Sequence, residues 1–164
     1  MHQECFEFVA RRLPTDITKK TTVVEFGSKD VNGNIHPLIG QAKYVGIDRE
    51  DGPNVDLVMD CQEYIGKADI VLCLELLEHC DDLDGVIQSI VDTIDEKGMA
   101  LITCATDPRP EHSAFDGGPL RTGEFYKNVS FKDLEKSVKK AGGKIKYKEI
   151  DVKCGDLRAE IYVV

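Results

Sequence analysis

Short hydrophobic runs alternate with amphipathic stretches along the chain. The runs are rich in β-branched residues and are bounded by glycine, proline or acidic residues, which is typical of buried strands. Five of them predict strands in the first two thirds of the chain: 22–26, 43–47, 55–59, 69–74 and 99–104. Two further runs, 144–152 and 157–164, flank turn residues around Gly155 and predict an antiparallel hairpin.

Three other stretches repeat their hydrophobic residues at helical spacing: 3–13, 83–94 and 130–141. The last begins at Ser130, has Asp133 three residues later as in a capping box, and ends at Gly142. Strands that alternate with helices favour a parallel sheet with helices on both faces. With the hairpin added, the sequence predicts an α/β fold in one domain, 1–164, with a mixed seven-stranded sheet.

The segment 105–129 follows neither pattern. It contains proline, glycine and aromatic residues without a sustained period, and at about 25 residues it is longer than most loops of compact domains. Its aromatic content is unusual for a disordered linker. We therefore expect it to form a lid or wall on the substrate side of the protein.

Charge and polarity exclude several classes of partner. The 164 residues carry 21 Lys and Arg against 30 Asp and Glu, a formal net charge of -9, so general nucleic-acid binding is not expected. No hydrophobic run approaches the roughly 20 residues that span a bilayer, and the N-terminus lacks a secretory pattern. We expect a cytoplasmic protein with no membrane partner. His2 and His36 are expected at the surface.

The six cysteines favour a reducing compartment. None of them belongs to a Cys-x-x-Cys pair, and Cys73 and Cys104 lie inside hydrophobic runs, where a thiol acts as a small core residue. We expect free structural cysteines rather than a zinc site or a disulfide framework.

Acidic residues stand at the ends of four predicted strands: Glu25, Asp48, Asp60 and Glu75. In an open parallel sheet, ligands bind beyond the carboxyl ends of the strands, so these side chains should converge on one rim. The carboxylate of Asp48 is suited to a ribose, because it can accept a hydrogen bond from each of two hydroxyl groups.

At these positions the sequence resembles the class I S-adenosylmethionine-dependent methyltransferases. The stretches that carry the resemblance are 23–28 (VVEFGS), 44–48 (YVGID), 55–60 (VDLVMD) and 68–79 (ADIVLCLELLEH), and the order of elements matches over essentially the whole chain. The resemblance implies a Rossmann-like fold and S-adenosyl-L-methionine as cofactor. The cofactor-binding residues it implies are Glu25, Gly27, Ser28, Asp48, Arg49, Asp60, Cys61, Leu74 and Glu75.

By the same resemblance, Glu25 and Gly27 would line the methionine end of the cofactor, and Asp48 would bind the ribose. Asp60 and Cys61 would lie at the adenine, and Leu74 and Glu75 would face the sulfonium. The first loop departs from the family. The usual acid-x-Gly-x-Gly-x-Gly pattern is reduced here to Gly27 and Gly33, with Lys29 and Val31 between them. The loop must therefore follow a different path beside the cofactor.

A nicotinamide-dependent dehydrogenase is an alternative interpretation, because such proteins also place an acid at the position of Asp48. Three features oppose it. The Gly-x-Gly-x-x-Gly pattern is absent, the chain has no second domain for a hydride-accepting substrate, and the terminal hairpin belongs to the methyltransferase pattern.

Glu75, Glu78 and His79 form a Glu-x-x-Glu-His motif. On a helical turn these positions point the same way, and oxygen and nitrogen ligands suit Mg²⁺ or Mn²⁺. The spacing resembles that of ubiquinone-pathway O-methyltransferases and small-RNA 3′-end methyltransferases, in which those positions hold a metal. By that resemblance His112 would be a further ligand. The alternative is that Glu75 binds the cofactor while Glu78 and His79 hydrogen-bond the next helix.

The long segment supplies the remaining polar candidates: Arg109, His112, Asp116, Arg121, Tyr126 and Asn128. A histidine titrates near neutral pH, so His112 is suited to take a proton from an acceptor hydroxyl. We expect His79, His112 and Glu78 to be catalytic. Asp116 and Arg121 are expected to stabilise turns.

Together these observations predict a methyltransferase that acts on an oxygen, or a nitrogen, of a small-molecule or glycan-type acceptor. Because the core uses nearly the whole chain, the acceptor site must come from 105–129, from the N-terminal helix, or from a second subunit of a homodimer. The alternative is a catalytically inactive S-adenosylmethionine-binding module that acts as a subunit or regulator. The small size and the reduced glycine motif favour that alternative.

Overall fold

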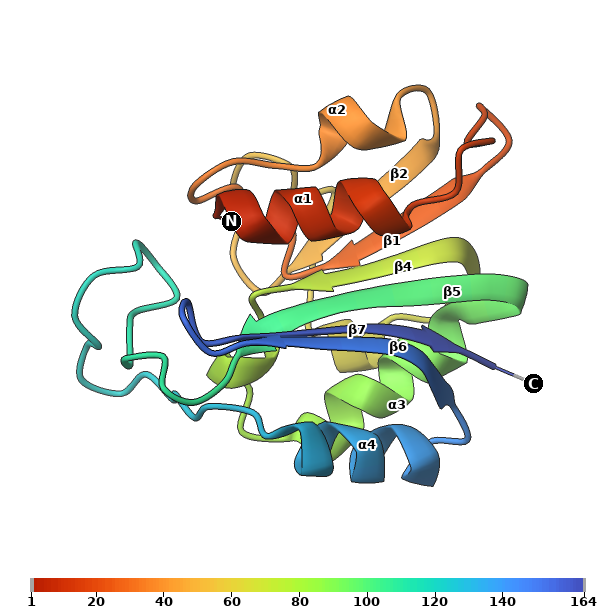
Figure 1. Cartoon of the computed structure of the whole chain (residues 1–164). Helices are drawn as coiled ribbons and strands as arrows, with labels where there is room; N and C mark the ends of the chain where they lie inside the picture. Colours follow the sequence, from red (N-terminus) through yellow and green to blue (C-terminus); the bar gives the residue numbers. More distant parts are fainter. Residues whose placement is uncertain (1, 164) are drawn as a thin grey trace.

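The computed structural model describes residues 2–163, and a mixed sheet lies at its centre (Figure 1). Its strands are β1 Thr22–Phe26, β2 Lys43–Asp48, β3 Leu57–Val58, β4 Ala68–Leu74, β5 Ile94–Ala105, β6 Lys144–Asp151 and β7 Asp156–Tyr162. They are ordered β3-β2-β1-β4-β5-β7-β6. Pairing is parallel from β3 through β5, and β7 is antiparallel to both of its neighbours. The predicted seven-stranded α/β sheet with a C-terminal hairpin is confirmed.

Helices cover both faces of the sheet, as predicted. One face carries α1 Gln3–Arg12 and α2 His36–Ile39, and the other carries α3 Leu83–Thr93 and α4 Phe131–Lys140 (Figure 1). Two 3-10 helices, η1 Cys61–Glu63 and η2 Leu77–His79, follow β3 and β4.

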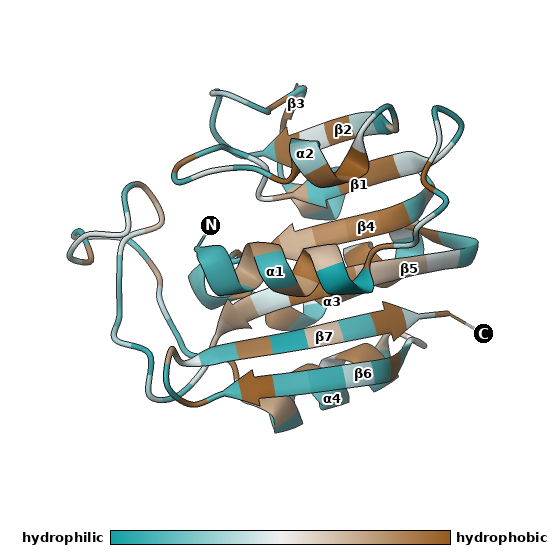
Figure 2. Cartoon of the chain, turned by 45° about the horizontal axis from the view of Figure 1, so that its top comes forward, coloured by the Kyte–Doolittle hydropathy of each residue, from teal (hydrophilic) through white to brown (hydrophobic). Residues whose placement is uncertain are grey.

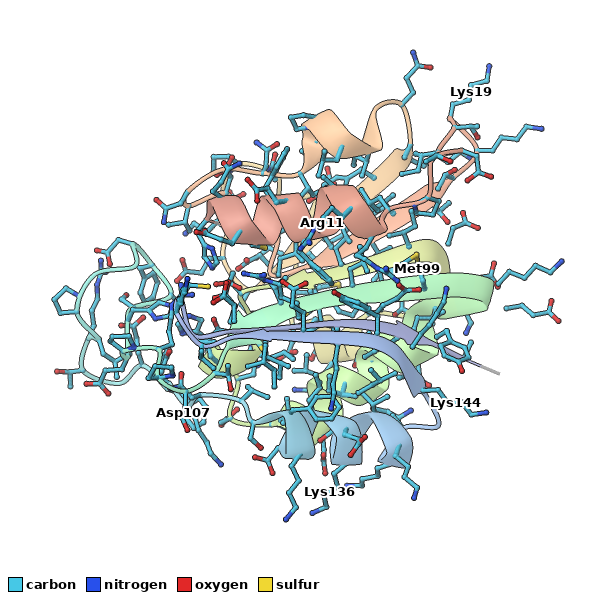
Figure 3. All side chains as sticks on the ribbon, in the orientation of Figure 1. Arg11, Lys19, Met99, Asp107, Lys136 and Lys144 are labelled. Atoms are coloured by element: carbon cyan, nitrogen blue, oxygen red, sulfur yellow. The ribbon has the colours of Figure 1, made fainter. Side chains whose placement is uncertain are left out.

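Each face of the sheet has its own hydrophobic core. Phe8 and Val9 of α1 pack on one face, and Ile87 and Ile90 of α3 pack on the other. Figure 2 shows hydrophobic residues gathered in the inner strands and a mostly hydrophilic long loop. The lysines of α4 lie outside the core, and Lys136 points away from the sheet (Figure 3). The amphipathic patterns of the sequence therefore correspond to real burial.

The structure corrects the predicted strands at two places. The third strand is Leu57–Val58 rather than 55–59, because Asp56 belongs to a turn in which its carboxylate accepts a hydrogen bond from the backbone N–H of Gly46 at 2.8 Å. The fifth strand begins at Ile94 instead of residue 99, with an irregular register before Met99. Helix α2 was not predicted, since four residues are too few to show a period. Met1 and Val164, which end the predicted domain, lie outside the described residues, and Val164 also ended the predicted last strand.

The carboxyl ends of the parallel strands meet at one edge of the sheet. The long loop, residues 106–130, lies at the same edge, and so does the start of α1 (Figure 1). Chain segments that are distant in sequence thus surround one region of space, where the fold can hold a ligand.

Two observations bear on cellular context. Among residues 2–163, no helix combines the length and the apolar character needed to cross a bilayer. All six cysteines are free and five of them are buried, as predicted for structural thiols.

Gly46 in β2 leaves no space for a side chain. A methyl group there would lie 1.8 Å from the carbonyl oxygen of Asn54 and 2.7 Å from Ser28 Oγ. We expect Gly46→Ala to lower the free energy of unfolding by about 3 kcal/mol, measured by urea denaturation. Gly52→Ala is the matched control, because its methyl group would meet only the movable side chain of Lys29. Equal losses in the two variants would contradict this account.

Candidate functional site

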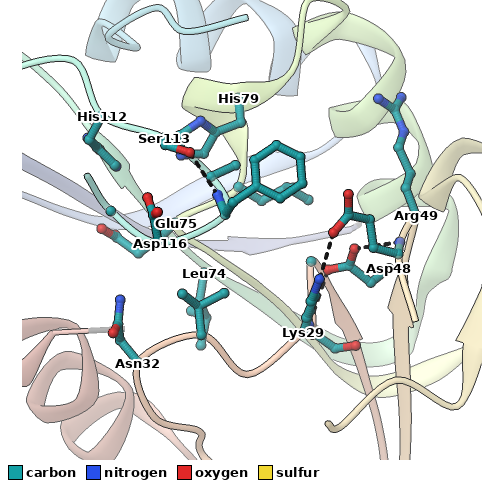
Figure 4. A pocket seen from close by; sticks show the side chains of 18 of the residues that line it. Lys29, Asn32, Asp48, Arg49, Leu74, Glu75, His79, His112, Ser113 and Asp116 are labelled. Carbon is teal, nitrogen blue, oxygen red and sulfur yellow. Dashed lines mark hydrogen bonds and ion pairs between the residues drawn. The ribbon is translucent and has the colours of Figure 1, made fainter. Parts of the chain in front are cut away.

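A cavity of about 830 Å³ lies beyond the carboxyl ends of β1, β2 and β4, within the size range of small-ligand sites. We call the part lined by Ser28, Asp48 and Cys61 the β2 side, and the part lined by His79 and residues 109–117 the loop side. Figure 4 shows Asp48 and His79 on opposite sides of this cavity. The long loop therefore forms a wall of the site.

Nearly all of the predicted cofactor residues line the cavity. They are Glu25, Gly27, Ser28, Asp48, Arg49, Cys61, Leu74 and Glu75. The exception is Asp60, which caps η1 by accepting a hydrogen bond from the N–H of Gln62 at 2.9 Å. Its other oxygen accepts a hydrogen bond from Arg49 Nε at 3.0 Å. Asp60 therefore supports Arg49 and the turn, and it does not line the cavity.

The first loop keeps the first glycine of the usual pattern, Gly27, and replaces the middle glycines with a different turn. Gly27 has a φ of +76°, and a Cβ there would approach Leu76 to 3.0 Å, so a glycine is required. The carboxylate of Asp30 then accepts hydrogen bonds from the N–H of Gly33 at 2.7 Å and from Asn34 Nδ2 at 2.9 Å. This turn holds the loop in the absence of the middle glycines.

Asp48 is fixed by backbone groups on both sides of its carboxylate. One oxygen accepts a hydrogen bond from the N–H of Lys29 at 3.1 Å, and the other accepts one from the N–H of Glu50 at 3.0 Å (Figure 4). A carboxylate oxygen has a second lone pair, so each can also accept a hydroxyl hydrogen. The geometry suits a vicinal diol such as that of a ribose.

Glu25 is a buried carboxyl group at the bottom of the cavity. It is 7% exposed, and the hydroxyl of Tyr44 donates a hydrogen bond to it at 2.5 Å. Burial raises the pKa of Glu25 to about 7, and the hydrogen bond from Tyr44 opposes part of that rise. A bound ammonium group would favour the ionised form of this carboxyl group.

The Glu-x-x-Glu-His motif does not form one helical turn. Glu75 has a φ of +58°, and η2 begins only at Leu77. The motif is consequently divided. Ligand atoms of Glu78, His79 and His112 lie within 4.8 Å of one another, whereas Glu75 belongs to a second group of that kind. The predicted convergence thus holds for three of the four residues, and the left-handed backbone at Glu75 is the reason that the fourth differs.

The group of Glu78, His79 and His112 contains polar atoms that lack partners. Glu78 is fully buried, and neither of its carboxylate oxygens makes a hydrogen bond of normal geometry. Burial and the nearby charge of Glu75 raise the pKa of Glu78. Nδ1 of His79 is also buried without a partner, and burial followed by the charge of His112 lowers the pKa of His79 to about 4. The rings of His112 and Tyr126 pack edge to face with 4.9 Å between centroids.

The second group contains His2, Glu75 and Asp156, and Arg109 joins it from the loop. His2 Nε2 lies 3.1 Å from Glu75 Oε2 and 3.3 Å from Asp156 Oδ1. Arg109 Nη1 donates to Asp156 at 2.6 Å, and its Nη2 donates to Glu75 at 3.5 Å. Hydrogen bonds to Asp156 and Glu75 raise the pKa of His2 to about 10.

The prediction of a surface position for His2 is therefore wrong, since this side chain is half-buried and lines the cavity. His36 is half-buried as well, with its ring centroid 4.4 Å from that of Tyr44. Neither contact has a local signal in the sequence. Both follow from tertiary packing that brings distant segments together.

The raised pKa of Glu25 makes stability depend on pH. The folded protein keeps a proton that the unfolded chain releases above its usual pKa of 4.5, so this stability is present below about pH 4.5 and is lost as the pH rises through about 7. Between pH 5 and 7.5, we expect Glu25→Gln to lose roughly 2 kcal/mol less unfolding free energy than the wild type. Urea denaturation across that range measures it. Glu135→Gln, on the exposed side of α4, should retain the wild-type dependence, and equal slopes in all three proteins would contradict the assignment.

No protein-family model matches the sequence, and no curated protein matches it. Solved structures do match its fold. A magnesium protoporphyrin IX methyltransferase from Synechocystis with bound S-adenosylmethionine has a TM-score of 0.70 and 17% identity, over 99% of this chain and 80% of that chain. A 1,6-didemethyltoxoflavin-N1-methyltransferase from Burkholderia thailandensis has a TM-score of 0.70 and 13% identity, over 96% and 77%.

The mitomycin 7-O-methyltransferase is similar as well, with a TM-score of 0.66 and 17% identity over 98% of this chain. The chain spans only 53% of the length of that protein. By their names the three proteins methylate different molecules, so the likeness concerns the fold and leaves the acceptor open. Sheet order, terminal hairpin, cavity and structural neighbours agree: the chain has the fold of the class I S-adenosylmethionine-dependent methyltransferases.

Proposed function

We propose that the protein transfers a methyl group from S-adenosyl-L-methionine to an oxygen, or a nitrogen, of a small-molecule or glycan-type acceptor. The observation that carries the proposal is the cavity at the carboxyl ends of β1, β2 and β4, which eight of the expected cofactor residues line. Solved structures of the same fold that hold S-adenosylmethionine or S-adenosylhomocysteine support the choice of cofactor.

The cofactor would lie along the β2 side of the cavity. The carboxylate of Asp48 would accept hydrogen bonds from the ribose hydroxyls, while Cys61 would contact the adenine and Glu25 would pair with the ammonium of the methionine end. Gly27 lets the backbone approach this end closely. The sulfonium would then face the loop side, near Leu74 and Glu75.

Methyl transfer requires alignment more than activation. The acceptor lone pair would attack the methyl carbon, the S–CH₃ bond would break, and its electron pair would return to sulfur to give S-adenosylhomocysteine with a neutral thioether. Because the sulfonium is already an activated donor, the protein contributes chiefly by holding the acceptor in line and excluding water. We propose that the loop side of the cavity performs this alignment.

A hydroxyl acceptor must also lose a proton, and we propose that His112 takes it. Its Nδ1 lies 3.2 Å from the carbonyl oxygen of Pro110, to which an Nδ1–H donates. That hydrogen bond fixes the tautomer in which Nε2 carries a free lone pair. We therefore assign His112 as the base, with His79 and Glu78 beside it.

A divalent cation is the alternative way to remove this proton. The group of Glu78, His79 and His112 fits a cation, because two carboxylate oxygens and one imidazole nitrogen are buried there without partners. One carboxylate with two imidazoles suits Mn²⁺ better than Mg²⁺, which prefers oxygen ligands alone. When bound, such a cation would lower the pKa of a hydroxyl group that contacts it.

The inactive cofactor-binding module remains the second candidate, and the reduced glycine pattern favours it. The two candidates differ in what His112 does. In an enzyme, His112→Ala would abolish methyl transfer and leave the affinity for S-adenosylmethionine unchanged. A module would bind the cofactor and transfer no methyl group, with or without His112.

Calorimetric titration with S-adenosylmethionine and S-adenosylhomocysteine tests the cofactor site. We expect both to bind, and we expect Asp48→Ala to weaken both by about 100-fold, because two hydrogen bonds to a charged group are lost. Asp51→Ala removes a nearby exposed carboxylate outside the cavity and should bind like the wild type. A folded wild-type protein that binds neither compound would contradict the proposed function.

Thermal unfolding with and without Mn²⁺ tests whether a cation binds to the group of Glu78, His79 and His112. A ligand at 100 times its Kd adds about 2.7 kcal/mol of stability, which raises the melting temperature by several degrees. Each variant is compared with its own metal-free melting temperature. We expect Glu78→Gln to lose the increase and Glu63→Gln, on the surface, to keep it. An increase that persists in Glu78→Gln would contradict this site.

A further inference from the structure

The loop side of the cavity presents rings rather than hydrogen-bonding groups. We infer that the methyl acceptor is a flat aromatic molecule that carries one or two hydroxyl groups. This inference rests on the proposed function and narrows it, because a glycan-type acceptor is then excluded. The loop pairs most of its polar side chains with protein groups and leaves few of them for a ligand.

The polar side chains in the middle of the loop are engaged with one another. Ser113 Oγ donates to Glu124 Oε1 at 2.8 Å, and the same carboxylate accepts hydrogen bonds from the N–H groups of Ala114 at 3.0 Å and Arg121 at 2.6 Å. Asp116 accepts hydrogen bonds from the N–H of Gly118 at 2.9 Å and from Arg121 Nη2 at 2.6 Å. This agrees with the turn-stabilising role expected for Asp116 and Arg121. These hydrogen bonds fix the loop, and each carboxylate oxygen of Glu124 and Asp116 already accepts at least one of them.

The polar side chains at the two ends of the loop are engaged as well. Arg109 is held by Asp156 and Glu75. Asn128 donates to Asp107 Oδ1 and to the carbonyl oxygen of Arg109, both at 2.9 Å, and accepts from the hydroxyl of Tyr126 at 2.8 Å. What remains along the loop side is Glu111, at the exposed rim, and the imidazoles of His79 and His112.

Two phenyl rings complete the loop side. Phe115 and Phe125 line the cavity, although they are 42% and 40% exposed. The guanidinium of Arg121 lies 4.8 Å from the ring centroid of Phe115 and covers one face of it. Exposed aromatic surface inside a cavity is unfavourable in water and marks a place where an apolar ligand surface can pack.

The two classes of acceptor differ in how many hydrogen-bond partners they need. A pyranose brings several hydroxyl groups into the cavity, and each one left without a partner there costs about 1–3 kcal/mol. On the loop side, two imidazoles and one rim carboxylate are the side chains that keep polar atoms for a ligand, fewer than the hydroxyl groups of a pyranose, and Glu75 Oε1 at the end of β4 adds only one acceptor. A flat aromatic molecule with one hydroxyl needs a single partner, which the Nε2 lone pair of His112 supplies, and its faces pack against the phenyl rings. The aromatic hydroxyl compound is therefore the better match.

Binding of two neutral probes to the protein loaded with S-adenosylhomocysteine tests the inference. The probes are β-naphthol and methyl α-D-glucopyranoside, measured by calorimetry in metal-free buffer. We expect β-naphthol to bind at least about tenfold more tightly than the glucoside. Phe115→Ala and Phe125→Ala should each weaken the binding of β-naphthol by about fivefold. Both should leave the Kd for S-adenosylhomocysteine within about twofold of wild type. Phe115→Tyr keeps the ring and should retain binding.

Ile65→Ala is the matched control, since Ile65 is an exposed hydrophobic residue outside the cavity and should affect neither probe. Equal or tighter binding of the glucoside overturns the inference. So does the absence of β-naphthol binding to the loaded protein, or unchanged affinity in both phenylalanine variants. If the protein does not bind S-adenosylhomocysteine at all, the proposed function fails first and the inference falls with it.

Discussion

The structure depends on β4, which is hydrogen-bonded on both sides and covered on both faces. It pairs with β1 and β5, and only Asp69 among its seven residues is exposed. A strand in that position can tolerate almost no polar residue, so the first polar groups after it appear where the sheet ends. Glu75 is the first polar residue after β4, and its left-handed backbone turns the chain away from the helical path of η2. The separation of Glu75 from the group of Glu78, His79 and His112 follows from this one turn.

A cluster of ionised groups connects the residue before α1 and the start of β7 to the cavity. Asp156 is fully buried at the start of β7, and it is paired with Arg109 from the loop, with Arg158 and with His2. A buried carboxylate persists only where opposite charges and hydrogen bonds compensate its lost hydration. His2 is held in place by α1, whose Cys5 contacts Thr103 of β5 at 3.1 Å. The shape of the cavity thus depends on packing well outside it.

The sequence predicted most of the fold and most of the side chains that line the cavity beside β1, β2 and β4. Bounded hydrophobic runs and helical periodicity located the long elements, and parallel topology brought Glu25 and Asp48 to one end of the sheet. The patterns said little about short elements such as α2 and β3, because two to four residues carry no period. They also misplaced His2 at the surface and did not reveal the partners of Arg109, since the residues that these two side chains contact lie far away in the sequence. The turn at Glu75 was missed because a positive φ at a glutamate has no compositional signal.

The two edges of the sheet differ in how they meet solvent. One edge is β3, which has only two residues, and the other is β6, where Lys144, Lys146 and Lys148 alternate on the exposed side. A short edge offers too few free backbone groups to recruit another strand, and a lysine row repels a second copy of itself. Strand addition is therefore disfavoured at both lateral edges, which protects the sheet from edge-to-edge aggregation while the cavity at the carboxyl ends of β1, β2 and β4 stays open.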